Sequence, residues 1–216
     1  MAPPEILCLT NGVFAENCYI VADREAGDAV LVDPGEEAGL FLARLRTEGL
    51  RLSAIWLTHA HLDHVAGIAA VKAEHDVPIW LHPADRPLYD RAPDQARMFL
   101  GTTLPPLPPP DRLIVPGEPM WVGSCEFAVA HVPGHSLGSV AFLTDGVAIV
   151  GDVLFAGSVG RVDLPGGSGP TLLASIRDVL LPLPDETVVY AGHGPATTIG
   201  QERATNPFLT GAIPLA

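Results

Sequence analysis

The feature that most constrains the fold is an alternation of strand-like and helix-like segments along the first 82 residues. Short runs rich in Val, Ile, Leu and Tyr predict strands at 6–10, 17–23, 28–35, 52–59 and 77–82. Apolar residues at helical spacing predict helices at 36–50 and from His64 to about His75. A chain that alternates strands with helices is expected to form an α/β architecture, with functional groups just beyond the strand ends.

The second half of the chain begins with a Pro-rich stretch, LGTTLPPLPPPDR at 100–112. Because proline-rich sequence favours extended backbone, we expect an extended connection or a lid edge there, centred near 104–110. Further strands are predicted near 112–115, 125–131, 139–144, 146–150 and 187–193, with a helix at about 170–181. Metal-ligand candidates lie on both sides of this stretch, so both halves must meet, and we expect one domain over 1–216.

Charge and composition limit the kinds of molecule that the chain is expected to bind. The formal net charge is −13, with 12 Lys and Arg against 25 Asp and Glu, and no basic stripe is visible, so no nucleic-acid partner is expected. The first residues, MAPPEILCLT, do not resemble a signal peptide, and no apolar stretch approaches the ~20 residues that span a membrane. The three cysteines include no C-x-x-C pair, so no disulfide framework is expected. These features predict a soluble, cytoplasmic protein.

The strongest local signal is THAHLDHVAG at 58–67, which follows a strand-like run and opens a helix-like segment. Its H-x-H-x-D-H pattern places four metal-competent side chains within six residues, namely His59, His61, Asp63 and His64. Such side chains rarely gather in an apolar segment without partners. Imidazoles and carboxylates are the usual ligands of zinc and similar divalent ions, so the motif predicts a metal site. The alternative is a polar loop in which Asp63 caps the following helix.

Three later segments contribute further metal-ligand candidates, which this motif alone does not provide. VPGHSLGS places His135 in a turn after a strand, VGDVLFAGS places Asp152 after the apolar run VAIV, and YAGHG places His193 after TVVY. Each candidate stands beside a glycine, where backbone can approach a metal closely. Any one of the three would fit a hydrogen-bonded structural residue, but the ordered set indicates a metal centre.

This ordered series resembles the metallo-β-lactamase superfamily. Longer segments at 151–167 (GDVLFAGSVGRVDLPGG), 191–202 (AGHGPATTIGQE) and 206–209 (NPFL) resemble the short, single-domain relatives of glyoxalase II, as do DPG at 33–35 and ENCYIV at 16–21. The resemblance covers nearly the whole chain and implies an αββα sandwich. Full-length glyoxalase II has a C-terminal helical domain that supplies glutathione contacts. We expect this chain to have no counterpart of that domain.

The resemblance also implies a ligand set for two divalent cations. Zinc suits these ligand types best, and iron and manganese use them as well. The implied ligands of the first metal are His59, His61 and His135. The implied ligands of the second are Asp63, His64 and His193, with Asp152 bridging the pair. Asp63 and Asp152 are the carboxylates expected to take part in catalysis.

Three further residues are candidates for a place near the site. Asp33 resembles a family residue that supports the metal loops. His75, His82 and His131 are expected to be structural residues, and a place behind the ligands is the alternative for His131, which lies close to the site in sequence. Arg161 is expected to pair with Asp163 and brace a loop, a substrate contact being the alternative.

The implied reaction is hydrolysis of a thioester such as S-lactoylglutathione by a hydroxide that bridges the two metals. A thiol with a pKa of about 8.5 leaves without much protonation, so no Ser or Cys nucleophile is required, and the expected partner is a small-molecule thioester. Two alternatives stay open. Persulfide dioxygenases share this fold and hold one iron through positions matching His59, His135 and Asp152. A non-enzymatic relative would bind metal for structure or for partners.

Overall fold

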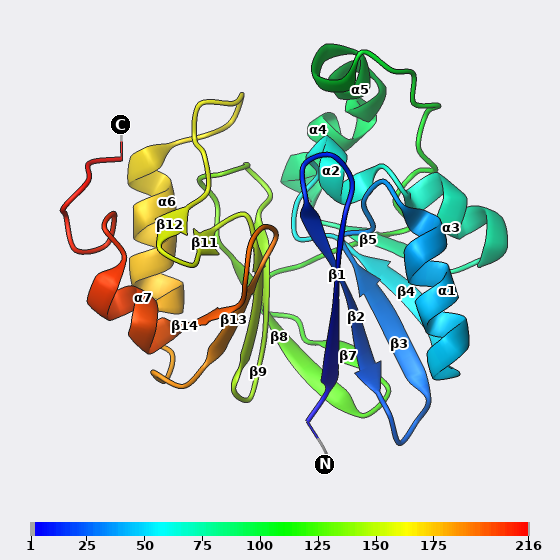
Figure 1. The fold of residues 1–216 in the computed structure, drawn as a ribbon, viewed down its shortest axis with the longest axis horizontal. Helices are drawn as coiled ribbons and strands as arrows, with labels where there is room; N and C mark the ends of the chain where they lie inside the picture. Colours follow the sequence, from blue (N-terminus) through cyan, green and yellow to red (C-terminus); the bar gives the residue numbers. More distant parts are fainter. Residues whose placement is uncertain (1–2, 216) are drawn as a thin grey trace.

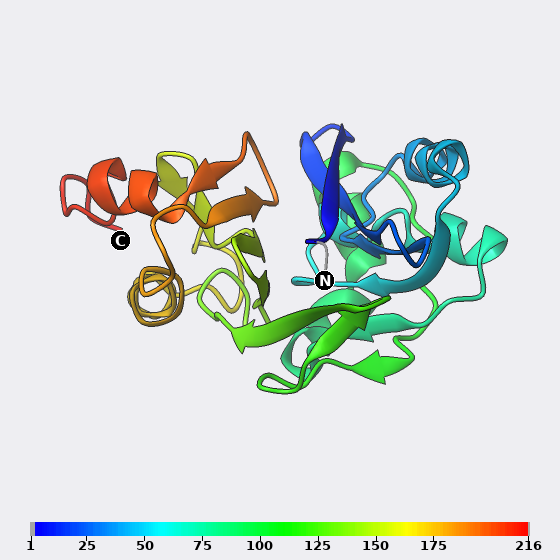
Figure 2. The ribbon, with the colours of Figure 1, turned by 90° about the horizontal axis from the view of Figure 1, so that it is seen from below.

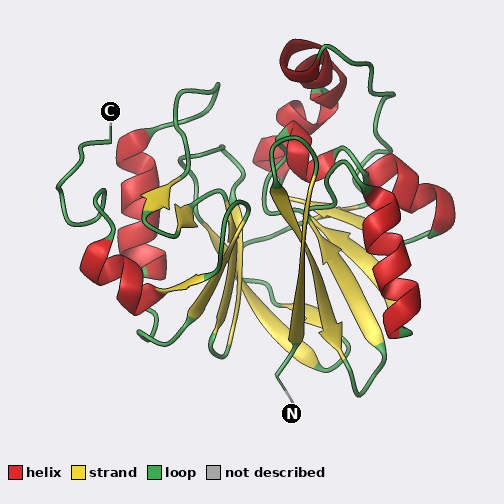
Figure 3. Cartoon of the chain, viewed as in Figure 1, coloured by secondary structure: helices red, strands yellow, loops and turns green. Residues whose placement is uncertain are grey.

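Two sheets packed face to face form the centre of the molecule. The computed structural model describes residues 3–215 of the chain. Each sheet has six strands, and helices cover the outer face of each one (Figures 1 and 3). Seen from below, the two sheets lie next to each other with helices on the outside (Figure 2). The structure is therefore the expected αββα sandwich.

The first sheet contains the N-terminal strands in sequence order. They are β1 (Glu5–Asn11), β2 (Glu16–Asp23), β3 (Asp28–Val32), β4 (Arg51–Trp56), β5 (Ile79–Leu81) and β6 (Arg112–Leu113). The pairs β1–β2 and β2–β3 are antiparallel, and the remaining pairs are parallel. Parallel neighbours need crossover connections, which α1 (Ala38–Glu48), α2 (Leu62–Val65) and α3 (Ile68–Glu74) supply.

The second sheet has the strand order β14-β13-β10-β9-β8-β7. Its strands are β7 (Met120–Val122), β8 (Cys125–His131), β9 (Val140–Thr144), β10 (Val147–Gly151), β13 (Val188–Ala191) and β14 (Thr197–Thr198). Two helices lie on its outer side, α6 (Gly169–Ser175), which continues as a π-helical turn over Ile176–Leu180, and α7 (Ile199–Thr205). A small hairpin, β11 (Leu154–Phe155) with β12 (Ser158–Val159), follows β10.

Alternating side chains of the central strands build two different cores. Along β2, Cys18 and Ile20 belong to the cluster that also contains Phe41 of α1, whereas Tyr19 and Val21 belong to the cluster between the sheets. Successive strand residues point to opposite faces, so a strand covered on both sides is buried throughout. All eight residues of β2 are buried.

The helix predicted from His64 to His75 is broken into α2 and α3 at Gly67. The Gly67 N–H donates to the Pro34 carbonyl oxygen at 3.0 Å. A Cβ atom on Gly67 would lie only 2.1 Å from the Gly35 oxygen, so the chain after β3 can approach only a glycine here. The apolar spacing was correct, but this close backbone contact interrupts the helix.

Two helices between β5 and the Pro-rich stretch were not predicted. They are α4 (Arg86–Asp90) and α5 (Ala92–Leu100), preceded by a 3₁₀ turn at Pro83–Asp85. Pro87 and Pro93 suggest helix breaks in sequence, but each stands in a first turn, where proline is tolerated. The stretch 102–110 is an extended connection, and the Tyr89 hydroxyl donates to the Pro108 carbonyl oxygen at 2.7 Å behind α4.

Two expectations drawn from composition also find counterparts in the fold. Within residues 3–215, no disulfide joins any of the three cysteines. Over the same residues, no helix has the length and apolar character that crossing a bilayer requires.

A buried carboxylate connects the loop after β4 with the loop after β8. Asp85 is 1% exposed and accepts hydrogen bonds from the Ala60 N–H at 3.0 Å, the Ser136 hydroxyl at 2.8 Å and the Gly138 N–H at 2.6 Å. Burial raises the pKa of Asp85, and these three donors oppose the rise. The first loop belongs to one sheet and the second to the other, so Asp85 joins the two halves of the sandwich.

We expect Asp85→Ala to lower the free energy of unfolding by about 3 kcal/mol, because it leaves three buried donors without an acceptor. For a chain of this length, that loss corresponds to a Tm about 6–12 °C lower. Asp76→Ala is the control, since Asp76 is fully exposed and pairs only with Lys72, and it should change the stability by less than about 0.5 kcal/mol. Denaturant unfolding measures the free energy of unfolding of both variants. If Asp85→Ala were as stable as Asp76→Ala, the role of Asp85 would be contradicted.

Candidate metal centre

The sequence-predicted ligands come together at one end of the sandwich. His59 and His61 follow β4, His135 lies between β8 and β9, Asp152 follows β10, and His193 follows β13. The pair β10–β13 is parallel, so both strands deliver their carboxyl ends to the same edge. This is the edge at which open α/β sheets place their functional groups.

Three histidines form the first cluster. The distance from His61 Nδ1 to His135 Nε2 is 2.7 Å, and that from His135 Nε2 to His59 Nε2 is 3.2 Å. All three side chains are buried, and their nitrogens lie within 4.8 Å of one another. Three imidazole nitrogens that converge in this way form one face of a tetrahedral metal site.

The outward-facing nitrogens of two of these rings are already bound. His135 Nδ1 lies 2.8 Å from the Arg161 carbonyl oxygen, an acceptor only, so this nitrogen carries the proton. His59 Nδ1 lies 3.1 Å from the Thr58 hydroxyl, which itself donates to Asp33 Oδ2 at 2.5 Å. Both Nε2 atoms therefore keep a lone pair directed into the cluster, as metal ligation requires.

Asp63, His64 and His193 form the second cluster. His193 Nε2 lies 3.2 Å from Asp63 Oδ2, and His64 Nε2 lies 3.8 Å from the same oxygen. On their outer sides, His193 Nδ1 contacts the Phe14 carbonyl oxygen and His64 Nδ1 contacts Asp33 Oδ2, each at 3.1 Å. These contacts again leave each Nε2 free to face the cluster.

Asp152 lies between the two clusters. Its Oδ1 is 3.4 Å from His64 Nε2, and its Oδ2 is 3.5 Å from both His135 Nε2 and His193 Nε2. One carboxylate thus faces ligand candidates of both groups, which is the arrangement that a bridging ligand needs.

The donor set fits divalent cations. Among the described residues, His64 Nε2 and Asp152 Oδ1 are buried and have no hydrogen-bond partner. Leaving such atoms unsatisfied costs about 1–3 kcal/mol each, and a cation between them would remove this cost. Nitrogen and carboxylate ligands of this kind suit zinc, and they also suit iron and manganese. As metal ligands, the seven residues remain a prediction.

The charges of the buried groups agree with this fit. Burial lowers the pKa of His59 well below its usual value, and the neighbouring His64 and His135 lower it further, so the His59 ring is neutral. Burial alone would raise the pKa of Asp152, but His64 and His193 hold it well below its usual range. Burial alone would lower the pKa of His64, but Asp63 and Asp152 raise this pKa well above its usual value. A bound cation would therefore displace a proton from His64.

Asp33 supports the ligands from behind, as its resemblance implied. Its Oδ1 accepts from the Thr58 N–H at 2.7 Å, and its Oδ2 contacts the Thr58 hydroxyl and His64 Nδ1. Asp33 also lies within ligand distance of His59 and His64, but its oxygens are already occupied by these three contacts. Its backbone has a φ of 54°, so the residue turns the chain sharply after β3.

The other two candidates lie outside the clusters. The His131 side chain is exposed, stacks on His82 with ring centroids 4.5 Å apart and contacts the Leu137 carbonyl oxygen at 2.9 Å. Neither of these contacts is with a ligand candidate, so they give no support to a place of His131 behind the ligands. Arg161 pairs with Asp163 through two contacts of 2.7 Å, as predicted, while its carbonyl oxygen orients His135.

Sequence reasoning missed Glu16, a buried carboxyl next to the site. Glu16 is 1% exposed, accepts from Asn11 Nδ2 at 2.6 Å and lies 3.8 Å from His64 Nδ1. Burial raises the pKa of Glu16 well above its usual value, which favours the neutral carboxyl. The available signal was its position at the start of a strand that is otherwise apolar, ENCYIVAD.

A cleft of about 340 Å³ opens over the two clusters, and we call it the metal cleft. Beside the ligand candidates, it is lined by the aromatic rings of Phe14, Phe99 and Phe155 and by Arg161 and Leu164. This volume lies within the range of small-molecule sites. The arrangement can therefore hold a small molecule against the cluster atoms.

Comparisons with known proteins agree with this geometry. Hydroxyacylglutathione hydrolase GloC of Haemophilus influenzae is 39% identical to the chain, with 95% of the chain and 97% of that protein covered. The crystal structure of BLEG-1 B3 metallo-beta-lactamase is 40% identical with a TM-score of 0.89, covering 95% of this chain and all of that one. The structure of TTHA1623 in a di-iron-bound form is 46% identical with a TM-score of 0.86, covering 94% and 100%.

Other relatives are described only as uncharacterized proteins or probable metallo-hydrolases. The family match itself spans residues 11–193 and includes all seven ligand candidates. With most of its length in this match, the chain belongs to the metallo-beta-lactamase superfamily.

Proposed function

We propose that the chain is a metal-dependent hydrolase of thioesters, with S-lactoylglutathione as the first substrate to test. The observation that carries the proposal is the pair of histidine–carboxylate clusters with Asp152 between them. Hydrolysis forms a bond from a water oxygen to the acyl carbon and breaks the carbon–sulfur bond. The products are a carboxylate and a thiol, and the site must accept the proton that water releases.

Two divalent cations, when bound, would acidify a water and polarise the acyl carbonyl. The residues of the chain have the remaining tasks. His59, His61 and His135 would hold one cation, and Asp63, His64 and His193 the other. The outward hydrogen bonds of His59, His64 and His135 fix the ring orientations before substrate arrives. The rings that line the metal cleft limit the access of bulk water to the acyl carbon.

The relatives support this substrate class and leave a choice of metal. GloC of Haemophilus influenzae is named a hydroxyacylglutathione hydrolase and aligns with nearly the whole chain. We propose zinc as the metal because of the histidine-rich donor set, and the di-iron form of TTHA1623 makes iron the competing assignment.

Two other reactions compete with thioester hydrolysis. The similarity to BLEG-1, described as a B3 metallo-beta-lactamase, favours β-lactam hydrolysis as the second candidate. A persulfide dioxygenase would need one iron on His59, His135 and Asp152. The additional convergence of Asp63, His64 and His193 argues for a two-metal hydrolase instead.

If each cluster binds one metal, a variant that disturbs one cluster should lose one of the two metals. Asp63→Ala and His193→Ala should each reduce the content from about two metals per chain to about one, because they disturb only the second cluster. His131→Ala is the matched control and should bind as the wild type does. Elemental analysis after zinc loading and desalting measures the content. Two metals in Asp63→Ala, or an equal loss in His131→Ala, would count against the assignment.

Asp152→Ala should lower kcat/KM for the thioester by more than about 100-fold. Loss of a partner behind a metal ligand typically costs 10–100-fold, and Asp152 faces both clusters directly. Asp178→Ala removes an exposed carboxylate that pairs with Arg177, and it should leave turnover unchanged. Near-wild-type turnover in Asp152→Ala would refute its bridging role.

The proposal itself is tested by S-lactoylglutathione hydrolysis with metal-loaded protein, followed by loss of the thioester absorbance. Turnover should disappear on chelation and in His59→Ala. Benzylpenicillin hydrolysis and oxygen uptake with glutathione persulfide are measured on the same preparation. If S-lactoylglutathione is stable in metal-replete protein while either of the other substrates is consumed, the thioesterase proposal fails.

A further inference from the structure

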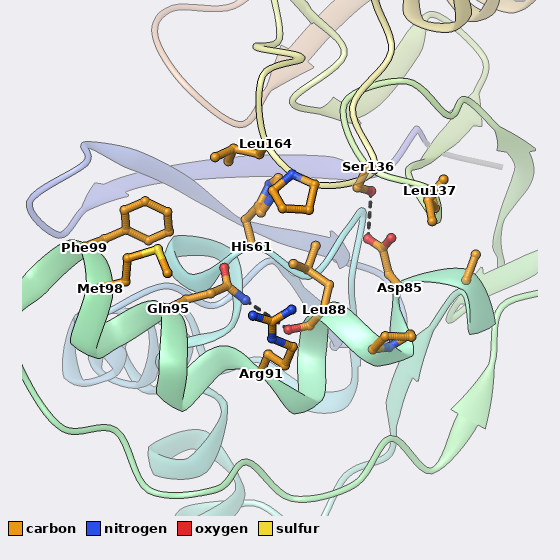
Figure 4. A pocket seen from close by; sticks show the side chains of 14 residues that line it. His61, Asp85, Leu88, Arg91, Gln95, Met98, Phe99, Ser136, Leu137 and Leu164 are labelled. Atoms are coloured by element: carbon orange, nitrogen blue, oxygen red, sulfur yellow. Dashed lines mark hydrogen bonds between the residues drawn. The ribbon is translucent and has the colours of Figure 1, made fainter.

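A second cavity adjoins the metal cleft, and we propose that it binds the acyl group of the substrate. The substrate is then a thioester with an uncharged, apolar acyl chain longer than acetyl. This inference rests on the proposed thioester hydrolysis and names its substrate class. We call this space the acyl cavity, and Figure 4 shows the residues around it.

The walls of the acyl cavity are apolar. Its volume is about 300 Å³. On one side lie Leu88 and Met98 of the segment that contains α4 and α5, and on the other side lie Leu137 and Leu164 (Figure 4). Apolar surface of this kind favours apolar ligands, because their burial removes hydrocarbon from water.

The buried carboxylate and amide on the lining already have hydrogen-bond partners. Asp85 accepts three hydrogen bonds, one of them from the Ser136 hydroxyl (Figure 4). The Gln95 side chain accepts from the Leu62 N–H at 3.2 Å and donates to the Leu88 carbonyl oxygen at 3.0 Å. A polar ligand group entering the cavity would therefore lose water without gaining these partners, which is unfavourable.

The acyl cavity is continuous with the metal cleft. His61, Phe99 and Leu164 line both spaces. His61 Nδ1 also lies 2.7 Å from His135 Nε2, so the acyl cavity begins beside the first cluster. One substituent of a carbonyl held at the clusters can follow the acyl cavity, and the other leaves through the metal cleft.

The charge of each substituent on the thioester carbonyl determines whether it enters the acyl cavity or leaves through the metal cleft. Thiol carriers such as glutathione carry carboxylates, and placing them among apolar walls would be costly. Arg91, at the edge, is the one cationic residue among those that line the acyl cavity. The single lysine, Lys72, is bound to the Val77 carbonyl oxygen at 2.9 Å, away from the lining. The uncharged acyl group is the part of the substrate that fits.

The mouth of the cavity carries large apolar side chains that face solvent. Met98 is 71% exposed, Leu137 58% and Phe99 44%. Contiguous exposed apolar residues at a cavity typically mark a ligand site. A chain longer than acetyl would cover them, and this contact gives the site a preference for chain length.

The first experiment measures kcat/KM of metal-loaded protein on N-acetylcysteamine thioesters with acetyl, butanoyl, hexanoyl and succinyl groups. We expect kcat/KM to rise by up to about fourfold per added methylene, the fold-change that corresponds to about 0.8 kcal/mol. Butanoyl should exceed succinyl, which has the same length and a terminal carboxylate. A flat chain-length profile, or a preference for succinyl through Arg91, would overturn the inference while leaving thioester hydrolysis intact.

Met98→Asp places a carboxylate in the exposed wall and should lower the hexanoyl-to-acetyl ratio of kcat/KM about tenfold. The matched control is Leu40→Asp, because Leu40 is also an exposed apolar helix residue, on α1, and does not line the cavity. Leu137→Trp is a second variant, which fills the mouth and should shift the preference to shorter chains. An unchanged ratio in both Met98→Asp and Leu137→Trp would overturn the inference.

A binding measurement separates this inference from the proposed function. N-ethylhexanamide and N-ethylacetamide are uncharged and resist hydrolysis, so calorimetry can compare their affinities for the metal-loaded protein. Binding at least about tenfold tighter for the hexanamide, weakened by Met98→Asp but not by Leu40→Asp, supports the acyl cavity even if no thioester is cleaved. Equal affinities for the two amides would overturn it, whatever the outcome of the thioester assay.

Discussion

The arrangement of the site depends on hydrogen bonds that fix the histidine rings from behind. His59, His64, His135 and His193 each use Nδ1 for an outward partner and turn Nε2 toward the clusters. In a neutral ring such as His59, this contact fixes the tautomer and leaves the Nε2 lone pair for a cation, whereas at His64 a cation would first displace a proton. Thr58 directly precedes His59, but the other outward partners lie far from their histidines in sequence: Asp33, the Arg161 backbone and the Phe14 backbone. The ligand geometry therefore requires the whole sandwich to be assembled, and no short peptide could reproduce it.

Several polar contacts between the two halves of the sandwich lie next to the site. Asp85 binds the loop after β4 and the loop after β8. At the opposite side of the site, Asn17 of β2 donates to the Ala191 and Gly194 carbonyl oxygens at 3.1 and 2.8 Å, and the Tyr19 hydroxyl donates to the Ala191 oxygen at 2.6 Å. Each contact joins a segment of the first half of the sandwich to a ligand-bearing segment of the second half. The two halves are thereby held at the spacing that brings Asp152 between the clusters.

Much of this could be predicted from sequence, because the relevant signals are local. Most strands of both sheets follow from short apolar runs, although the short strands β7 and β14 were not predicted. The H-x-H-x-D-H motif marks its own strand end. The supporting residues could not be found in this way. Asp85 and Glu16 are single carboxyl residues without a motif, and only long-range packing makes them buried neighbours of the site. The helices α4 and α5 were missed because Pro87 and Pro93 suggest breaks, whereas in the structure they begin helices. The contacts of His131 with His82 and Leu137 could not be predicted either, because closeness in sequence does not determine the direction of a side chain on a strand.

The ligand candidates and the α5 wall of the acyl cavity lie on different segments of the chain, and this separation affects substrate specificity. The ligand candidates lie on loops fixed by buried hydrogen bonds, and a change there alters metal binding. The wall formed by α5 ends at Gly101 in a left-handed conformation and continues into the extended stretch 102–110, which contains no ligand candidate. Met98 and Phe99 on this wall are exposed and contribute little to the buried core. Substitutions in α5 can therefore change the group that fits beside His61 while leaving the clusters in place. In this architecture, the chemistry and the choice of substrate are carried by separate segments of the chain.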